Sequence, residues 1–375
     1  MLKKFSVSNF KNFENRIEVD FGKHSNYEFN KDIVQDDCIS KCMVYGINGS
    51  GKSNLALAIF DIVLHLTDKE KLVDKYLPFY HNLNSKKLEA EFEYTYIFDG
   101  IELIYSYRKK DPFTLTYEKM MIDGVEVFWF DYLQNNGECK LRGTENLNLI
   151  QQEDMGGGQI SRIKYIKSNS MLFENEVNRT FISFIRSVES MLLFYSLDQN
   201  RYQGFRNGAE SYTQGILRAK KMEDFEVFLK GNQIDYNLVE MNINGIPEIG
   251  CRMGKNIVPF SLVASTGTKS LALFFYWYIS LNNVSLVYID EFDAFYHHEL
   301  AIKLVELLRD KKDTQVIFST HNTDLLSNDI LRPDAYYKIH DNRIDSLSAL
   351  TSKDLRQAHN IQKMYKAGAF SEQSS

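Results

Sequence analysis

Residues 46–53 read Gly-Ile-Asn-Gly-Ser-Gly-Lys-Ser and fit the phosphate-binding loop pattern G-x-x-x-x-G-K-[ST] at every required position. Glycines let backbone N–H groups turn toward phosphate oxygens, Lys52 can reach the β- and γ-phosphates, and the Ser53 hydroxyl can ligate Mg²⁺. The loop follows a short apolar run (residues 42–45) and precedes apolar positions at helical spacing up to Leu66. The sequence therefore predicts a strand–loop–helix unit with a phosphate at the helix N-terminus. The candidate nucleotide-binding residues are Asn48, Gly49, Ser50, Gly51, Lys52, Ser53 and Asn54.

A second apolar strand, over residues 284–291, ends in Asp290 and Glu291. A buried parallel strand would bring Asp290 to the magnesium shell beside Ser53, and Glu291 could act as general base on the attacking water. A further apolar strand, residues 315–321, ends in His321 at the place of a γ-phosphate sensor. The alternatives are that Asp290 and Glu291 are only a solvated pair at a strand end, and that His321 has a structural role. We interpret Ser53 and Asp290 as metal ligands, and Glu291 and His321 as catalytic.

Period-two alternation marks the other strands. Residues 1–21 predict two strands joined by a turn near residues 12–15, and residues 88–130 predict an antiparallel meander with tight turns at Asp99-Gly100 and Asp123-Gly124. Residues 236–260 return to strand character around Asn244-Gly245. We expect the many aromatic residues of the meander to pack in the core rather than to stack on nucleic-acid bases.

The middle of the chain has helical periodicity over residues 171–196 and 222–229. We expect residues 67–87 to be an irregular, mobile surface segment and the triple glycine at residues 156–158 to be a linker. The predicted division is an N-terminal half of an ATPase lobe over residues 1–130, a helical insertion over 131–235, and the C-terminal half over 236–375.

Composition narrows the possible partners. The formal net charge of −6 excludes a global basic field for nucleic acid, although residues 162–221 are locally basic. Those cations are either a solvated face or a patch for nucleic acid or an acidic partner. They are Arg162, Lys164, Lys167, Arg201, Arg206, Arg218, Lys220 and Lys221.

The sequence contains no clear motif for secretion, for a membrane or for a zinc site. The four cysteines are scattered without a C-x-x-C pair, and neither a membrane-spanning run nor a signal-peptide core is present. We therefore expect a cytoplasmic protein with reduced thiols and no membrane partner. His297, His298 and Glu299 lack the H-E-x-x-H spacing of a zinc site, and we interpret them as connector residues.

Four short segments occur in an order that resembles a known family. They are residues 48–54, 265–269, 290–293 and 319–322. Their order is similar to that of the ABC-type ATPases of the SMC/RecF branch. More narrowly, it resembles the AAA-type ATPases of abortive-infection and overcoming-lysogenisation-defect systems. Residues 9–13 are similar to the first strand and turn of these proteins, so the resemblance covers roughly residues 1–110 and 235–350.

The resemblance implies an α/β fold: an ABC-type P-loop NTPase head with an antiparallel β subdomain and an inserted helical subdomain. It implies ATP and Mg²⁺ as cofactors. Ser265 and Gly267 would belong to a signature motif that contacts the γ-phosphate of ATP held by a partner subunit. Asp293 would lie on the dimer-facing D-loop, and His321 would be the switch histidine. A homodimer or larger homo-oligomer is therefore expected.

Three functions fit this pattern. The first is an ATP-driven, dimerising sensor or scaffold of a bacterial antiphage defence system that controls a separately encoded effector, a nuclease or a toxin. This hypothesis depends on the resemblance. The second is a DNA-binding ATPase of repair or recombination, and the third is a scaffold that binds ATP but turns it over slowly. The segment after His321 has no Glu…Asp-x-Asp constellation, so we expect no nuclease within the chain.

Overall fold

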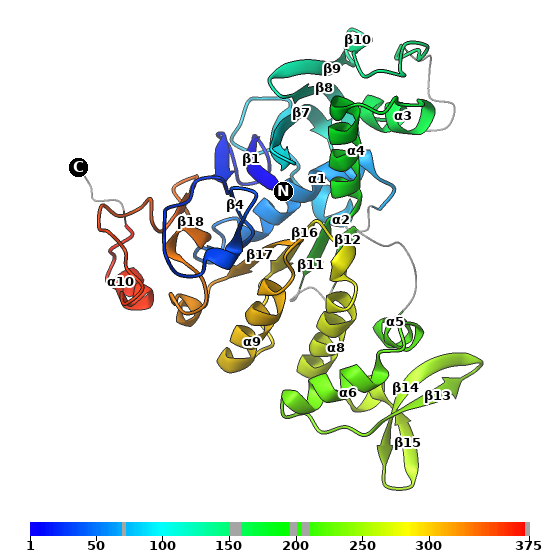
Figure 1. Cartoon of the computed structure of the whole chain (residues 1–375), viewed down its shortest axis with the longest axis vertical. Helices are drawn as coiled ribbons and strands as arrows, with labels where there is room; N and C mark the ends of the chain where they lie inside the picture. Colours follow the sequence, from blue (N-terminus) through cyan, green and yellow to red (C-terminus); the bar gives the residue numbers. More distant parts are fainter. Residues whose placement is uncertain (70–72, 151–158, 196–200, 205–210, 372–375) are drawn as a thin grey trace.

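The computed structural model describes residues 1–69, 73–150, 159–195, 201–204 and 211–371, without the side chains of residues 201–203. Its central sheet has seven strands in the order β12-β11-β16-β17-β5-β18-β19 (Figure 1). The five inner strands are parallel and the two edge strands pair antiparallel to their neighbours. The strands are β5 (Lys41–Tyr45), β11 (Leu192–Tyr195), β12 (Arg201–Gly204), β16 (Leu286–Asp290), β17 (Gln315–Thr320), β18 (Tyr336–His340) and β19 (Arg343–Ser346).

Strand order decides where the polar ends of these strands meet. β17 lies between β5 and β16, so the phosphate-binding loop, the acidic pair and the histidine all follow neighbouring parallel strands. The carboxyl ends of parallel strands lie at one edge of a sheet, which is where open α/β sheets bind ligands. The predicted strands at residues 42–45, 284–291 and 315–321 are confirmed, within one or two residues.

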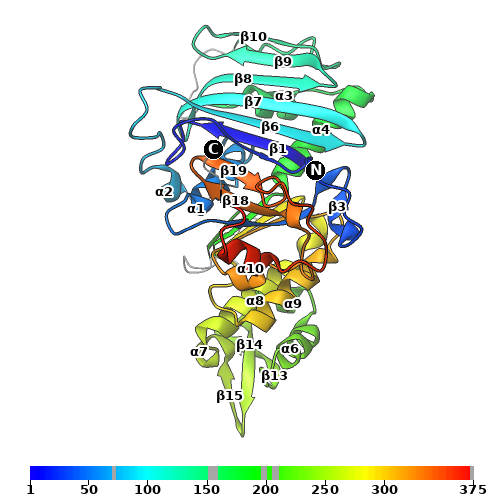
Figure 2. The same cartoon turned by 90° about the vertical axis from the view of Figure 1, so that its left-hand side faces the viewer.

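A second sheet of seven antiparallel strands lies above the first, in the order β10-β9-β8-β7-β6-β1-β2 (Figure 2). The predicted meander is confirmed, including turns at Asp99-Gly100 and Asp123-Gly124 in which all four residues have positive φ. Its strands are β1 (Leu2–Ser8), β2 (Ile17–Asp20), β6 (Ala90–Phe98), β7 (Ile101–Asp111), β8 (Thr114–Ile122), β9 (Val125–Asp131) and β10 (Asn136–Cys139).

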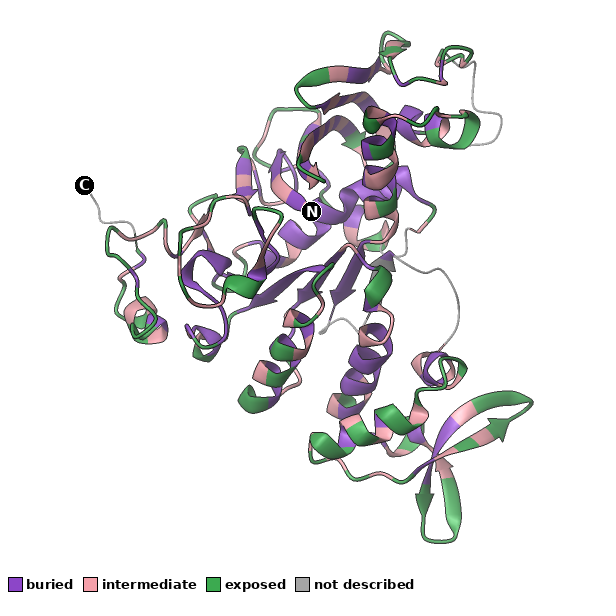
Figure 3. Cartoon of the chain, in the orientation of Figure 1, coloured by how far each residue is buried: buried purple, intermediate pink, exposed green. Residues whose placement is uncertain are grey.

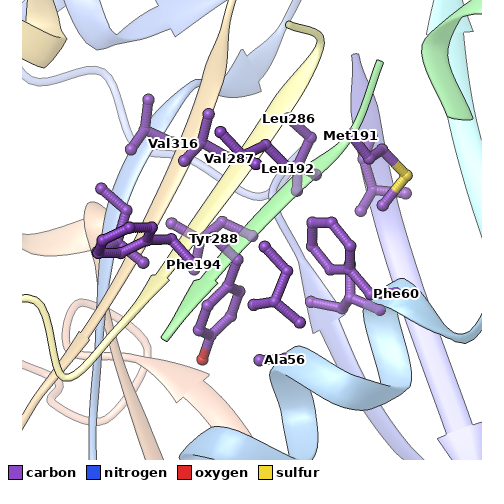
Figure 4. Close-up of a cluster of buried hydrophobic side chains, with 14 of the residues drawn as sticks. Ala56, Phe60, Met191, Leu192, Phe194, Leu286, Val287, Tyr288 and Val316 are labelled. Atoms are coloured by element: carbon purple, nitrogen blue, oxygen red, sulfur yellow. The ribbon is translucent and has the colours of Figure 1, made fainter. Parts of the chain in front are cut away.

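Helix α1 (Lys52–Leu66) begins directly at the phosphate-binding loop and is packed between the two sheets. Every residue from Leu55 to Leu66 is buried (Figure 3). Figure 4 shows Ala56 and Phe60 of α1 against the side chains of β11 and β16, such as Tyr288. On the other side, the Tyr94 hydroxyl of β6 donates to the Ala58 carbonyl at 2.9 Å. The position of the loop is therefore fixed by the whole core.

Beneath the central sheet a smaller lobe carries a three-stranded antiparallel sheet, β13-β14-β15 (Figure 1). The hairpin expected at Asn244-Gly245 is confirmed, with φ of +53° and +86°. Helix α8 leads from this lobe back to β16. The lobe contains α5 (Tyr212–Arg218), α6 (Met222–Gly231), β13 (Leu238–Ile243), β14 (Ile246–Met253), β15 (Asn256–Pro259), α7 (Phe260–Val263) and the start of α8 (Thr266–Tyr278).

The α/β fold class is confirmed: a mostly parallel sheet, with the phosphate-binding loop at the start of α1, lies beside an antiparallel sheet. One segment differs from the prediction. Residues 171–196 were expected to be helical, but they form α4 (Glu176–Glu189) and then β11, which pairs with β16 in the central sheet. A buried apolar run of four residues fits the apolar spacing of a helix and of a strand equally well. Pairing with β16 in the central sheet makes this run a strand. Residues 131–235 are thus only partly helical, and the proposed domain division stays a prediction. The glycines 156–158 lie outside the described residues.

A buried ion pair joins α1 to the antiparallel sheet. The Lys109 ammonium of β7 lies 2.6 Å from the Asp61 carboxylate, and neither side chain is exposed. Tyr80 and Tyr107 each donate a hydroxyl to the same carboxylate at 3.0 Å. Burial lowers the pKa of Lys109, and the Asp61 carboxylate opposes that change. With these three donors the buried carboxylate is satisfied.

Lys109→Met should therefore destabilise the fold strongly, by about 3–5 kcal/mol, because the Asp61 carboxylate would lose its counter-ion in the core. Urea unfolding followed by circular dichroism measures this loss. Lys119→Met is the matched control: its pair with Glu126 at 2.8 Å is about one-third exposed, and its loss should cost under about 1 kcal/mol. Equal effects of the two substitutions would contradict the assigned role of the buried pair.

Candidate nucleotide-binding site

The phosphate-binding loop has a backbone that only its glycines can supply. Gly51, the N-cap of α1, has φ of +105°, and a β-carbon there would collide with the Asn12 side chain. The Lys52 ammonium donates to the Gly46 carbonyl at 2.9 Å. The Ser50 hydroxyl is buried and has no hydrogen-bond partner among the described residues. A helix N-terminus, an ammonium group and an unsatisfied hydroxyl together fit a phosphate chain.

The two predicted metal ligands are in contact. The Ser53 hydroxyl donates to one carboxylate oxygen of Asp290 at 2.6 Å, and the Ser319 hydroxyl donates to the other at 2.5 Å. Burial raises the pKa of Asp290, and these two hydrogen bonds oppose the rise. A hydroxyl and a carboxylate suit a hard cation, so Ser53 and Asp290 could hold Mg²⁺. Mg²⁺ bound there would neutralise charge on the β- and γ-phosphate oxygens.

Glu291 follows the last residue of β16 and has φ of +50°, a region rarely used by non-glycine residues. One oxygen of its carboxylate lies 2.9 Å from His321 Nδ1, and the other lies 3.6 Å from Lys52 Nζ. The structure thus brings together the two predicted catalytic residues and the lysine of the loop. A carboxylate beside the lysine of a phosphate-binding loop can accept a proton from water.

Two hydroxyl residues at the end of β17 contact the same acidic segment, and the sequence reasoning gave neither a role. Ser319 contacts Asp290, as described above. Thr320 donates its hydroxyl to Asp293 Oδ1 at 2.7 Å. The available signal was their position: hydroxyl residues at the end of a buried strand directly before the histidine.

Asn12 is a further contact that the motif did not reveal. Its side-chain amide donates to the Ser50 carbonyl at 3.3 Å and its amide oxygen accepts from Asn54 at 2.7 Å. The adjoining Lys11 ammonium donates to two carbonyls, of Lys75 and Pro78, at 2.8 and 3.0 Å. Burial lowers the pKa of Lys11 to about 8. The turn between β1 and β2 therefore braces the phosphate-binding loop.

The segment expected to be mobile, residues 67–87, is tied to the same turn. It contains α2 (Val73–Tyr76) and the two carbonyls that accept from Lys11. Asn82 donates its side-chain amide to the Lys11 carbonyl at 2.8 Å. These bonds anchor the described part of the segment beside the loop.

Ser265 and Gly267 lie at the N-terminus of α8. Ser265 caps the helix, accepting the Thr268 N–H at 3.1 Å, and a β-carbon on Gly267 would lie 3.4 Å from the Phe295 carbonyl. Farther along α8, Ser270 lies 2.8 Å from the Tyr296 hydroxyl. The start of α8 therefore borders the segment after β16 that carries Asp293. A role toward a partner's nucleotide stays a proposal.

Three further observations concern His297, metal clusters and membrane-spanning helices. His297 caps α9 (His298–Arg309), where its Nδ1 accepts the Leu300 N–H at 3.3 Å, as suits a connector residue. In the part of the chain that the structure describes, no cluster of three His, Cys, Asp or Glu residues is placed to hold a metal ion. Among the described helices, none combines the length and apolarity that crossing a bilayer requires.

At least four of the eight cations in the locally basic middle region have contacts within the protein. Arg162 is buried, with its guanidinium 4.8 Å from the Phe130 ring centre. The neighbouring lysines pair with acids; these pairs are Lys164 with Asp68, Lys167 with Glu189 and Lys221 with Asp224. Arg206 and the side chain of Arg201 lie outside what the structure describes. These contacts favour the solvated face over a nucleic-acid patch, and nucleic-acid binding stays an untested prediction.

Comparison with known proteins gives a match of part of the chain to one family model, and a set of similar structures. Residues 173–327 match the model of the family described as "AAA domain, putative AbiEii toxin, Type IV TA system". No curated protein matches the chain. Among solved structures, the SMC head domain from Thermotoga maritima has 17% identity and a TM-score of 0.41, covering 92% of this chain and 97% of that one.

Two further structures are similar to this chain. The SmcHead bound to the C-winged helix domain of ScpA has 15% identity and a TM-score of 0.46, covering 93% of this chain and 98% of its own. The Smc head domain with an extended coiled coil, bound to the C-terminal domain of ScpA derived from Pyrococcus furiosus, has 15% identity and a TM-score of 0.42, covering 93% and 97%.

The loop geometry makes Gly51→Ala testable against Gly100→Ala. Both glycines have positive φ, but only at Gly51 would a β-carbon meet another side chain. Each substitution should destabilise by at least about 1 kcal/mol through backbone strain. Only Gly51→Ala should abolish binding of a fluorescent ATP analogue, measured by anisotropy with Mg²⁺. Unchanged affinity in Gly51→Ala would exclude this loop as the phosphate site.

Proposed function

We propose that this chain binds and hydrolyses ATP and dimerises when ATP is bound. One observation carries the proposal: the Ser53 hydroxyl and the Asp290 carboxylate, 237 residues apart in sequence, lie 2.6 Å apart. This contact joins the phosphate-binding loop to the acidic strand end. A fortuitous Gly-Ser turn would have no reason to face such a carboxylate.

Each residue then has a chemical role. Lys52 and the loop backbone bind the phosphates, and residues 48–54 surround them. Ser53 and Asp290 hold the metal. Glu291 accepts a proton from the attacking water, and His321 orients that carboxylate and senses the γ-phosphate. In the present geometry the Glu291 carboxylate faces Lys52 at 3.6 Å, so a γ-phosphate entering beside the lysine would meet the general base directly.

The second subunit would complete the site. Ser265 and Gly267 stand at the start of a helix, where N–H groups can bind a γ-phosphate that the partner holds. The same helix contacts the segment after β16 through Ser270 and Tyr296. ATP would thus favour a closed dimer and hydrolysis would release it, a two-state element driven by differential contacts with the nucleotide.

We further propose that the switch works as a sensor or scaffold in bacterial antiphage defence, in the cytoplasm, and controls a separately encoded nuclease or toxin. Support comes from the resemblance to abortive-infection ATPases. It also comes from the match of residues 173–327 to the family described as "AAA domain, putative AbiEii toxin, Type IV TA system". Both are associations with other proteins.

Particle mass tests the switch. Wild type, Glu291→Gln and Lys52→Ala would be co-expressed with the products of neighbouring reading frames, and their masses measured by native mass spectrometry with ATP and Mg²⁺. Glu291→Gln should accumulate as a dimer or larger assembly because it binds ATP but cannot activate water. Lys52→Ala should stay monomeric because it loses the phosphate contact.

What the ATP-trapped assembly contains distinguishes effector control from DNA repair. An ATP-trapped assembly that carries a neighbouring gene product supports control of an effector. A bare dimer that gains affinity for DNA supports the repair function instead. If Glu291→Gln has the same mass as Lys52→Ala, ATP-driven dimerisation is wrong.

A further inference from the structure

The carboxyl end of β17 presents three successive polar side chains to the acidic segment that follows β16. Each of them contacts a different acid, at distances between 2.5 and 2.9 Å. The three pairs are Ser319 with Asp290, Thr320 with Asp293, and His321 with Glu291. Only the histidine has a role in the proposed chemistry.

Ser319 is the member whose hydroxyl contacts both Asp290 and Glu291. Its hydroxyl donates to Asp290 Oδ1 at 2.5 Å and accepts the backbone N–H of Glu291 at 2.9 Å. The side chain is fully buried, so water does not compete for either bond. The direction of the first bond is fixed, because an ionised carboxylate can only accept. One hydroxyl thus joins the metal-binding carboxylate to the backbone of the general base.

We propose that Ser319 is a positioning residue for hydrolysis: it fixes Glu291 and Asp290 relative to each other. The inference depends on the proposed ATPase function and adds to it a residue that acts through Asp290 and Glu291. Its contribution is geometric, since a shift of about 1 Å in a catalytic group can cost on the order of 100-fold in rate.

The backbone of Glu291 shows why such a support is needed. Its φ of +50° is sparsely populated for a residue with a side chain. Such a conformation persists only where surrounding contacts fix it. Ser319 supplies two of them, because its hydroxyl accepts the Glu291 N–H and its carbonyl accepts the Phe292 N–H at 3.2 Å. Without the hydroxyl, the Glu291 N–H loses this acceptor and the peptide can rotate, which would carry the carboxylate away from His321 and Lys52.

Binding and turnover should respond differently. The other oxygen of Asp290 keeps its bond to Ser53 when Ser319 is changed. The phosphate-binding loop is braced separately by Asn12. The proposal therefore predicts slower hydrolysis with little loss of nucleotide affinity, whereas a residue that only supports the fold would lower both together.

The experiment compares Ser319→Ala and Ser319→Cys with wild type in steady-state ATP hydrolysis and in fluorescent-ATP binding with Mg²⁺. Cysteine keeps the volume but is a weak hydrogen-bonding partner. Both variants should lose roughly 10- to 100-fold in kcat, while their affinity stays within about threefold of wild type.

Ser40→Ala is the matched control. Ser40 is the residue just before β5 and is as buried as Ser319. Its hydroxyl donates to the Ile33 carbonyl at 2.9 Å. Its kcat should remain that of wild type. Melting temperatures of all variants show which of them fold. If Ser319→Ala does not fold, Ser319→Cys decides.

Each outcome has a distinct meaning. A normal kcat in a folded Ser319 variant, an equal loss of affinity and rate, or a slow Ser40→Ala would overturn the positioning role alone, provided that wild type is active and Glu291→Gln is not. If wild type hydrolyses ATP no faster than Glu291→Gln, the proposed function fails and the inference fails with it.

Discussion

The fixed position of α1 is the constraint on which the rest of the structure depends. The helix is buried on both sides, by the parallel sheet through Tyr288 and by the antiparallel sheet through Tyr94 (Figure 2). Tyr288 donates its hydroxyl at 3.0 Å to the carbonyl of Lys52, the residue that starts the helix. Because both faces are packed, the N-terminus of α1 cannot move without disturbing its packing against both sheets. The phosphate-binding loop requires such a support, because its backbone N–H groups must point in fixed directions to bind phosphate.

Burying a helix on all sides leaves its polar groups to be satisfied within the protein. Asp61 and His65 lie on the part of α1 that faces the antiparallel sheet, and each is matched by a partner there. His65 contacts the Tyr105 hydroxyl at 2.9 Å, which in turn donates to Glu118 at 2.6 Å. Glu118 then accepts the Ser161 hydroxyl at the start of α3 (Arg162–Asn169) at 2.6 Å. Helix α1 is thus connected to the middle of the chain by a series of hydrogen bonds.

Structural features that depend on residues adjacent in sequence could be predicted well. The phosphate-binding loop, the strand ending in Asp290 and the turn at Asn244-Gly245 each depend on neighbouring residues, and the structure has them where expected. β11 was missed because Leu192–Tyr195 enters the central sheet by pairing with β16, which follows far along the chain. Ser319 and Asn12 were missed for a similar reason. An ordinary serine or asparagine gains its role from partners that only the folded chain brings near.

The segment after β16 connects the chemistry to the rest of the molecule. At its start Glu291 is bound to His321, and Asp293 is bound to Thr320. At its far end Tyr296 contacts Ser270 of α8, the helix that leads from the smaller lobe back to β16. A ligand that moved Glu291 would therefore act on a segment that is fixed at one end by β17 and at the other by α8. Since packed segments tend to switch between discrete arrangements rather than bend gradually, nucleotide occupancy is well placed to change the position of α8. This connection gives the proposed dimer a physical route from one active site to the surface that the partner would contact.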